Sequence, residues 1–143
     1  ILHTGRFQKK ERELTEKAQE FLSIFNLEDR QTVIAKNMPY GEQRRLEIAR
    51  ALAAEPRLLL LDEPAAGMNA EEIDDLDQRI RAMRDQGRTI MLIEHHMELV
   101  MGVCDRVVVL NFGRKIAEGS PAQVQNDPQV RAAYLGADDE QAA

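Results

Sequence analysis

Residues 58–64 read LLLLDEP, and the predicted class of fold follows from this stretch. Four consecutive leucines are too few to cross a membrane and too uniformly apolar for a half-exposed strand, so they predict a strand buried on both faces of a parallel sheet. Asp62 and Glu63 come where that strand ends, and Pro64, which has no backbone N–H, cannot extend it. Because open α/β sheets bind ligands beyond the carboxyl ends of their strands, the two acids are placed to meet a ligand or a metal ion.

The segments before this strand are helical in pattern. Apolar residues that recur three or four positions apart predict a helix over 8–25 and a second helix over 42–54, which Gly41 opens and Pro56 stops. A glycine followed by a helix N-terminus offers backbone N–H groups and a positive dipole end, which suit a phosphate, although a plain turn is the simpler interpretation of one such glycine.

The segments after the strand predict an α/β fold with parallel strands, intervening helices and a terminal β-hairpin. A helix over 70–86 has Asn69 as its N-cap, with Glu72 placed to complete a capping box, and it leads to a second apolar strand, Thr89–Ile93. Because a helix separates the two strands, a parallel pair is the default. A short helix over 97–103, a strand over 106–110, a turn at 111–113, a strand over 114–117 and two further helices are then expected.

Length and composition indicate a water-soluble globular chain of about one domain. The 143 residues contain no apolar run near the roughly 18 residues of a membrane helix, so a membrane role is expected to come through a partner. A net charge of −6 argues against nucleic acid as the main ligand, since phosphate-backbone binding needs a clustered basic surface. Cys104 is the single cysteine, which favours a reducing cytoplasm.

Four motifs occur in order along the chain: YGEQRRLEIARAL at 40–52, LDEPAAGMN at 61–69, IEHHMELVMGVCDR at 93–106 and VRAAYLG at 130–136. Together they resemble the ATP-binding cassette (ABC) ATPases, and more narrowly the ATP-binding subunits of bacterial branched-chain amino acid transporters. The resemblance implies the C-terminal half of a P-loop NTPase domain. Residues 1–56 would be part of the helical subdomain with the signature loop and helix, residues 57–136 the C-terminal part of the ATPase core, and residues 137–143 a mobile acidic tail.

The resemblance also implies one metal ligand, Asp62, and two catalytic residues, Glu63 and His95. Asp62 would hold Mg²⁺ through water, an oxygen-ligand role that suits this hard cation. Glu63 would act as a base on the attacking water or orient it, and His95 would contact the γ-phosphate. A zinc site at His95 and His96 themselves is disfavoured, because adjacent side chains are expected to diverge and no Cys or third His lies nearby in sequence.

The family's signature sequence contacts the triphosphate bound by the opposite subunit. Its matching positions here are Met38, Pro39, Tyr40, Gly41, Glu42 and Gln43, and the family's loop that crosses the dimer interface includes Gly67 and Asn69. Pro39 departs from the family pattern, since it supplies neither a hydroxyl nor an N–H where the family has serine. Weakened phosphate contact is therefore expected at this half-site, and a degenerate half-site whose partner carries the turnover is the alternative.

The chain contains no phosphate-binding loop of the form G-x-x-x-x-G-K-(S/T). That loop holds the β- and γ-phosphates, so these residues alone are expected neither to bind ATP tightly nor to hydrolyse it. Without the strands that precede this point in the family, strand edges and apolar faces would be exposed, which predicts self-association.

The partners implied by the resemblance are a second ATPase subunit, in a homo- or heterodimer, and the transmembrane permease subunits. A periplasmic or extracellular substrate-binding protein would act indirectly, no nucleic acid is expected, and the location would be the cytoplasmic face of the cell membrane. Two alternatives stay open: a soluble ABC-type ATPase of DNA repair or translation, and a degenerate noncatalytic ABC subunit. Basic surface and long linker insertions would favour the first alternative, and neither is seen in this sequence.

Overall fold

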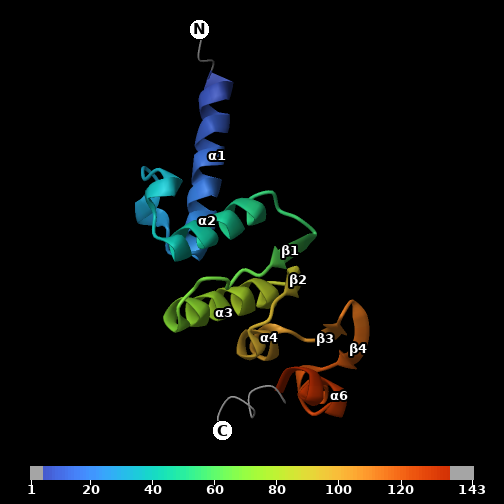
Figure 1. Cartoon of the computed structure of the whole chain (residues 1–143). Helices are drawn as coiled ribbons and strands as arrows, with labels where there is room; N and C mark the ends of the chain where they lie inside the picture. Colours follow the sequence, from blue (N-terminus) through green and yellow to red (C-terminus); the bar gives the residue numbers. More distant parts are fainter. Residues whose placement is uncertain (1–4, 136–143) are drawn as a thin grey trace. The chain divides into compact units, whose positions relative to one another are not determined.

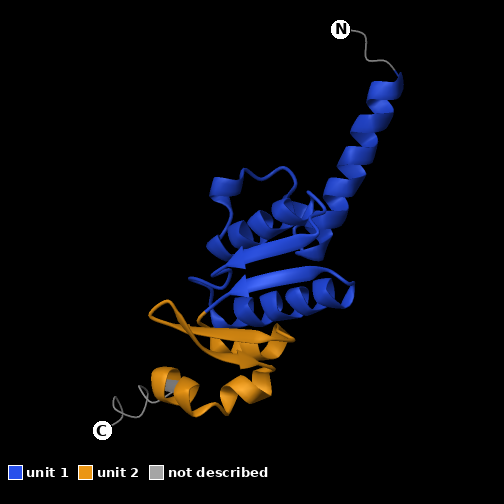
Figure 2. Cartoon of the chain, turned by 90° about the vertical axis from the view of Figure 1, so that its right-hand side faces the viewer, with its two compact units in different colours: residues 1–94 blue, residues 95–143 orange. Residues whose placement is uncertain are grey.

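The computed structural model describes residues 5–135, which form two compact units, 5–94 and 95–135 (Figures 1 and 2). The units are described separately below. The predicted acidic tail at 137–143 lies outside the described residues. Between residues 5 and 135, no helix combines the length and the apolar character needed to cross a membrane.

The first unit begins with the two predicted helices. Helix α1 spans Gly5–Ile24, and α2 spans Tyr40–Leu52 with Pro39 as its N-cap. The polar connection between them contains two short 3-10 turns, η1 (Glu28–Arg30) and η2 (Ala35–Asn37). Burial of α1 is confined to its C-terminal end: Phe21 is buried in the helix, and Phe25 and Leu27 just after it are fully buried. Both helices are confirmed, although each begins two or three residues earlier than expected.

The two apolar strands of this unit pair in parallel, as predicted. Strand β1 (Leu58–Asp62) and strand β2 (Thr89–Ile93) run in register from Leu58 opposite Thr89 to Asp62 opposite Ile93. Helix α3 (Ala70–Asp85) connects them and buries Leu76, Ile80 and Met83. Its start is the expected capping box: the Asn69 side chain accepts from the Glu72 N–H at 3.0 Å, and the Glu72 carboxylate accepts from the Asn69 N–H at 2.9 Å.

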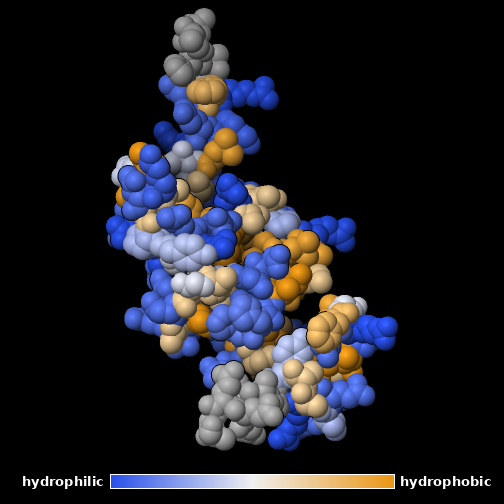
Figure 3. Space-filling model, in the orientation of Figure 1, coloured by the Kyte–Doolittle hydropathy of each residue, from blue (hydrophilic) through white to orange (hydrophobic). Residues whose placement is uncertain are grey.

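The prediction that β1 is buried on both faces is wrong. Leu59 and Leu61 are buried, but Leu58 is 46% exposed and Leu60 is 64% exposed. Paired residues of a parallel ladder face the same side, and Met91 and Ile93 on the same face of β2 are also exposed. Hydrophobic colour is concentrated over β1 and β2 in Figure 3. Within the described residues the sheet is therefore covered on one face only, and the expected exposed apolar face is present.

An ion-pair cluster joins the three helices of this unit. Arg79 of α3 is a buried charged residue, and it donates to Asp75 from Nε at 2.8 Å and from Nη2 at 2.6 Å. Its Nη1 donates to the carbonyl of Ile24, the last residue of α1, and its guanidinium carbon lies 5.8 Å from the centre of the Phe25 ring. Arg45 of α2 donates to the same Asp75 at 2.9 Å. One carboxylate thereby holds the end of α1 and the face of α2 on α3.

The second unit contains the predicted hairpin. Helix α4 (Met97–Val103) leads to β3 (Val107–Asn111), which pairs antiparallel with β4 (Arg114–Gly119). The connecting residues Phe112 and Gly113 both have positive φ, as a type I′ turn requires. Helix α5 (Pro121–Gln125) has a Ser120–Gln123 capping box, and a single turn of α6 (Pro128–Val130) continues into the π-helical segment η3 (Arg131–Leu135).

Candidate functional site

The two predicted acids lie at the carboxyl end of β1. Asp62 is the last strand residue, opposite Ile93, and the Glu63 N–H continues the ladder by donating to the Ile93 carbonyl at 2.8 Å. Glu63 then turns out of the strand with φ of +44°, a left-handed conformation that is costly for a residue with a Cβ. Both side chains belong to exposed residues. The strand therefore ends at this edge of the sheet, where the neighbouring residues Asp62 and Glu63 each place a carboxylate.

Glu94 fixes the loop that follows Glu63. It comes directly after β2, and its Oε1 accepts a hydrogen bond of 2.9 Å from the N–H of Ala65, which is fully buried. The loop then turns on itself through a 3.1 Å bond from the Ala66 N–H to the Glu63 carbonyl. Sequence reasoning missed this role of Glu94. The sequence did contain a signal for it: Glu94 directly follows a strand that was predicted to pair with β1. An acid at that position lies next to the loop that follows β1.

The predicted signature residues form the first turn of α2, and several of their polar groups are used within the turn. The Gln43 amide donates to the Met38 carbonyl at 2.8 Å, and the Gln43 N–H donates to the Pro39 carbonyl at 3.0 Å. Glu42 accepts from Arg30 at 2.9 Å. Pro39 makes no side-chain cap, so the positive end of this 13-residue helix is capped by none of its own side chains.

Tyr40 connects this turn to the loop after Glu63. Its hydroxyl accepts a 2.9 Å bond from Arg44 Nε, and the Arg44 guanidinium lies 5.3 Å from the ring centre. Hydrogen bonds to Glu47 and then to Tyr40 raise the pKa of Arg44, so this cation stays charged. The ring edge is packed so closely on Gly67 that a Cβ there would lie 2.9 Å from Tyr40 Cε1. Gly67 also has φ of +74°, so two separate constraints favour glycine at this position.

A second close approach lies beside the first. Gly41 is buried, and the Glu72 carboxylate fills the place where a side chain at position 41 would be, with Glu72 Cδ 2.7 Å from an ideal Cβ. Two segments predicted to contact nucleotide, 38–43 and 67–69, are thus brought together within one chain. Glu72 was predicted only as a helix cap, because its distance from Gly41 cannot be seen from spacing.

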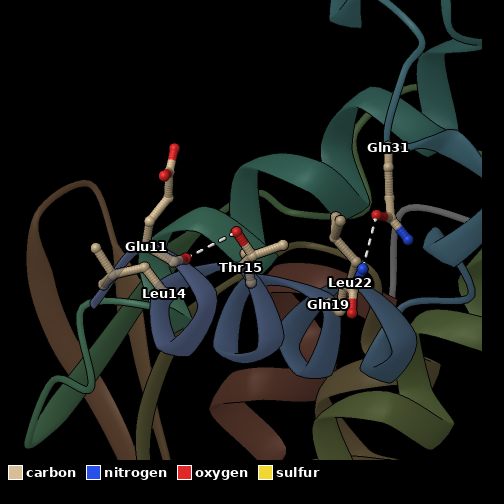
Figure 4. A pocket seen from close by; sticks show the side chains of 7 residues that line it. Glu11, Leu14, Thr15, Gln19, Leu22 and Gln31 are labelled. Carbon is tan, nitrogen blue, oxygen red and sulfur yellow. Dashed lines mark hydrogen bonds between the residues drawn. The ribbon is translucent and has the colours of Figure 1, made fainter. Parts of the chain in front are cut away.

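Hollows are found on the surface of the first unit. One of about 160 Å³ lies against Asp62, with a lining of Arg44, Glu47, Ile48, Ala51, Leu60, Leu61, Asp62 and Pro64. The larger, of about 350 Å³, lies along α1 and is lined by Leu14, Ala18 and Leu22 with Glu11, Thr15, Gln19 and Gln31 (Figure 4). It contains none of the predicted site residues. Of these two hollows, the smaller one therefore includes a predicted site residue, Asp62.

His95 belongs to the second unit, just before α4. Its ring centre lies 4.6 Å from that of His96, with the rings tilted by 36°, so the expectation that these two side chains diverge is wrong. Glu63 and His95 lie in different units, so the position of each is described only relative to its own unit. Asp62 and Glu63 are both exposed and carry carboxylate oxygens, the kind of ligand that a hard divalent cation such as Mg²⁺ prefers.

Comparison with known proteins gives consistent matches along the chain. The ABC transporter family model matches residues 3–66, and the model of the branched-chain amino acid ATP-binding cassette transporter matches residues 114–140. The high-affinity branched-chain amino acid transport ATP-binding protein LivG of Escherichia coli K12 is 44% identical over 137 residues, and the corresponding protein BraF of Pseudomonas aeruginosa is 45% identical. Both alignments cover 95% of this chain and 54% of the relative.

Solved structures agree with the sequence matches. The ADP conformation of MJ1267, an ATP-binding cassette of an ABC transporter, superposes with a TM-score of 0.78 at 30% identity. The match covers 87% of this chain and 50% of MJ1267. The chain thus spans about half the length of the relatives that it matches, and its fold is that of the corresponding part of an ABC ATPase domain.

Proposed function

Because this chain belongs to the ABC transporter family, we propose that it is the signature-bearing part of an ATP-hydrolysing subunit that powers the import of branched-chain amino acids. The observation that carries the proposal is the end of β1, where Asp62 and the left-handed Glu63 present two adjacent carboxylates. The substrate class rests on the resemblance to LivG and BraF, whose names describe branched-chain amino acid transport.

In this proposal Asp62 and Glu63 divide the work at the strand end. Asp62 would hold Mg²⁺, and the ion when bound would supply charge neutralisation for the transferring phosphoryl group. Glu63 accepts a hydrogen bond from the attacking water and orients it or takes its proton. The Glu94 bond to Ala65 supports this role, because it fixes the backbone immediately after Glu63. His95 contacts the γ-phosphate.

The signature turn acts on the nucleotide of a second subunit. Met38, Pro39, Tyr40, Gly41, Glu42 and Gln43 face the opposite triphosphate in this proposal, while Gly67 and Asn69 lie in the loop that crosses the interface. The positive end of α2 is suited to an anion, and no side chain of α2 caps it. Pro39 at the N-cap supplies no hydroxyl, so the contact depends on the backbone donors of the helix start and is weaker than with serine.

The proposed division of the chain assigns residues 1–56 to the helical subdomain and residues 57–136 to the ATPase core. The partners are a second ATPase subunit and the transmembrane permease subunits, with a substrate-binding protein acting indirectly. The helical segment, with the open face of α1, is the part that faces the permease. The subunit then lies at the cytoplasmic face of the membrane.

The experiment that tests the proposal measures Mg²⁺-dependent ATP hydrolysis by the full-length subunit and by its Glu63→Gln variant. We expect hydrolysis by the wild type and its loss in the variant, with nucleotide binding retained. Transport of radiolabelled leucine in vesicles that contain the permease subunits then tests the substrate class. Equal hydrolysis by wild type and variant would contradict the role of Glu63.

A further inference from the structure

Glu72 makes two contacts that lead to different parts of the proposed nucleotide site. Through Oε2 it accepts the 2.9 Å hydrogen bond from the N–H of Asn69, at the end of the loop that begins with Glu63. Its other oxygen lies against Gly41 in the first turn of α2. The Asn69 side chain holds the Glu72 backbone in turn at 3.0 Å, so the carboxylate has a fixed place.

Two further contacts, one on each side of the Glu72–Gly41 contact, also involve α2. Four residues further along α2, Arg45 donates to Asp75, which lies three residues after Glu72 on α3. On the other side, the ring of Tyr40 packs on Gly67. Residues 40, 41 and 45 of α2 therefore meet residues 67, 72 and 75 in order. The first turn of α2 therefore packs on the capping box of α3, and the contact is made by Gly41 and the Glu72 carboxylate.

From this arrangement we propose that Glu72 is a positioning residue, which couples the loop after Glu63 to the first turn of the signature helix. It does so by filling the space above Gly41 while it holds the Asn69 backbone. The consequence for ATP turnover rests on the proposed function. There, Glu72 would keep the signature turn of this subunit in a fixed position relative to its own Asp62 and Glu63. The backbone coupling itself does not depend on nucleotide.

The test is hydrogen–deuterium exchange in the nucleotide-free full-length subunit. The reporters are the backbone N–H groups of Gln43 and Arg44 at the start of α2. The backbone N–H of Gln43 donates to the Pro39 carbonyl, and neither of the two N–H groups donates to Glu72. Glu72→Ala removes both contacts, and Glu72→Gln keeps the shape and the capping geometry. Glu71→Ala is the matched control, because Glu71 is the exposed neighbouring acid on the same helix.

We expect Glu72→Ala to speed exchange at Gln43 and Arg44 by about fivefold, the size of a lost cap. Glu72→Gln and Glu71→Ala are expected to stay within about twofold of the wild type, since neither removes the packing or the cap. Should the alanine variant fail to fold, Glu72→Asp is used instead, because the shorter side chain cannot span both contacts.

Equal exchange in Glu72→Ala and Glu71→Ala would overturn the proposal, as would a glutamine variant that exchanges as fast as the alanine variant. ATP hydrolysis is measured on the same samples, where Glu72→Ala is expected to fall severalfold and Glu72→Gln to recover. A wild type without ATPase activity would count against the proposed function alone, because the exchange result still decides the role of Glu72.

Discussion

Arg79 grips Asp75 with two parallel hydrogen bonds, from Nε at 2.8 Å and from Nη2 at 2.6 Å, at the place where three helices meet. Such paired bonds are stronger than neutral ones. Since Arg79 is buried and also bonds to the Ile24 carbonyl, it anchors the end of α1. The signature helix is held to the same carboxylate through Arg45, so the geometry of the helical segment depends on Asp75.

Stability is expected to depend on pH through Asp75. Hydrogen bonds from Arg79, and then from Arg45, hold the pKa of this carboxyl below its usual range. A lowered pKa in the folded state means that the contribution is fully present above the unfolded value, about 3.9, and is lost as pH falls through the folded value. Asp75→Asn should therefore lower the free energy of unfolding at pH 7 by about 1–3 kcal/mol.

The measurement for Asp75 is urea unfolding at pH 7 and at pH 3. The difference between wild type and Asp75→Asn should shrink at the lower pH. Asp77→Asn is the control, because Asp77 pairs with the exposed Arg81 on the solvent side of the same helix and should cost less than about 1 kcal/mol. A constant difference at both pH values would show that Asp75 does not act through its charge.

Because Glu72 lies so close to Gly41, we expect Gly41→Ala to destabilise the wild-type protein but to stabilise the Glu72→Ala variant. In the wild-type background, Gly41→Ala places a Cβ on the Glu72 carboxylate and should destabilise the protein by about 1–3 kcal/mol. In a Glu72→Ala background the clash is gone, and alanine should stabilise the helix by up to about 1 kcal/mol. Thermal unfolding of the four proteins measures the cycle, and additive effects would rule out the contact.

The Tyr40–Gly67 contact is tested with a second glycine as reference. Gly67 and Gly87 both have positive φ, of +74° and +84°, but a Cβ at Gly87 meets nothing within 4 Å. Gly87→Ala should therefore cost only the left-handed conformation, about 1–2 kcal/mol. Gly67→Ala should cost more by the displacement of Tyr40, and this excess should vanish when Tyr40 is also replaced by alanine. Equal losses in the two glycine variants would refute the packing.

Neighbouring leucines of β1 test the one-sided burial of the sheet. Leu59 is 3% exposed and Leu60 is 64% exposed. Leu59→Ala should lower the free energy of unfolding by about 2–5 kcal/mol, because it leaves a cavity. Leu60→Ala should change it by less than about 0.5 kcal/mol in the 143-residue chain. Similar losses for both would mean that the exposed face is covered in solution, for instance by self-association, which sedimentation would detect.

Local patterns were enough to predict most of the fold. The helices, both positions of the α3 capping box and the hairpin depend on residues near one another in sequence, and they are confirmed. The parallel pair is confirmed as well, and it was predicted from the helix that separates its two strands. The four leucines at 58–61 misled, because a strand covered on one face and a strand covered on two can have the same composition. The family resemblance, rather than the periodicity, carried the prediction of ATPase chemistry.

The contacts that shape the site were not predictable from local pattern. Glu94 reaches Ala65 across 29 positions, and Arg79 reaches Ile24 across 55. Each acid and each arginine involved looks like a solvated helix or strand-end charge in the sequence. Only the parallel register, which sets Asp62 beside Ile93, brings Glu94 to the loop after Glu63. The positions of Asp62 and Glu63 were predicted, whereas the groups that hold their loop were not.

The most direct test of the central claim is Mg²⁺-dependent ATP hydrolysis by the full-length subunit, compared with its Glu63→Gln variant and with the 143-residue chain alone. We predict turnover by the wild type, a loss of at least about 100-fold in Glu63→Gln, as expected for a catalytic base, and no turnover by the chain alone. An inactive wild type would contradict the account and would mark the Pro39 half-site as degenerate. Undiminished turnover by Glu63→Gln would contradict the role of the β1 edge.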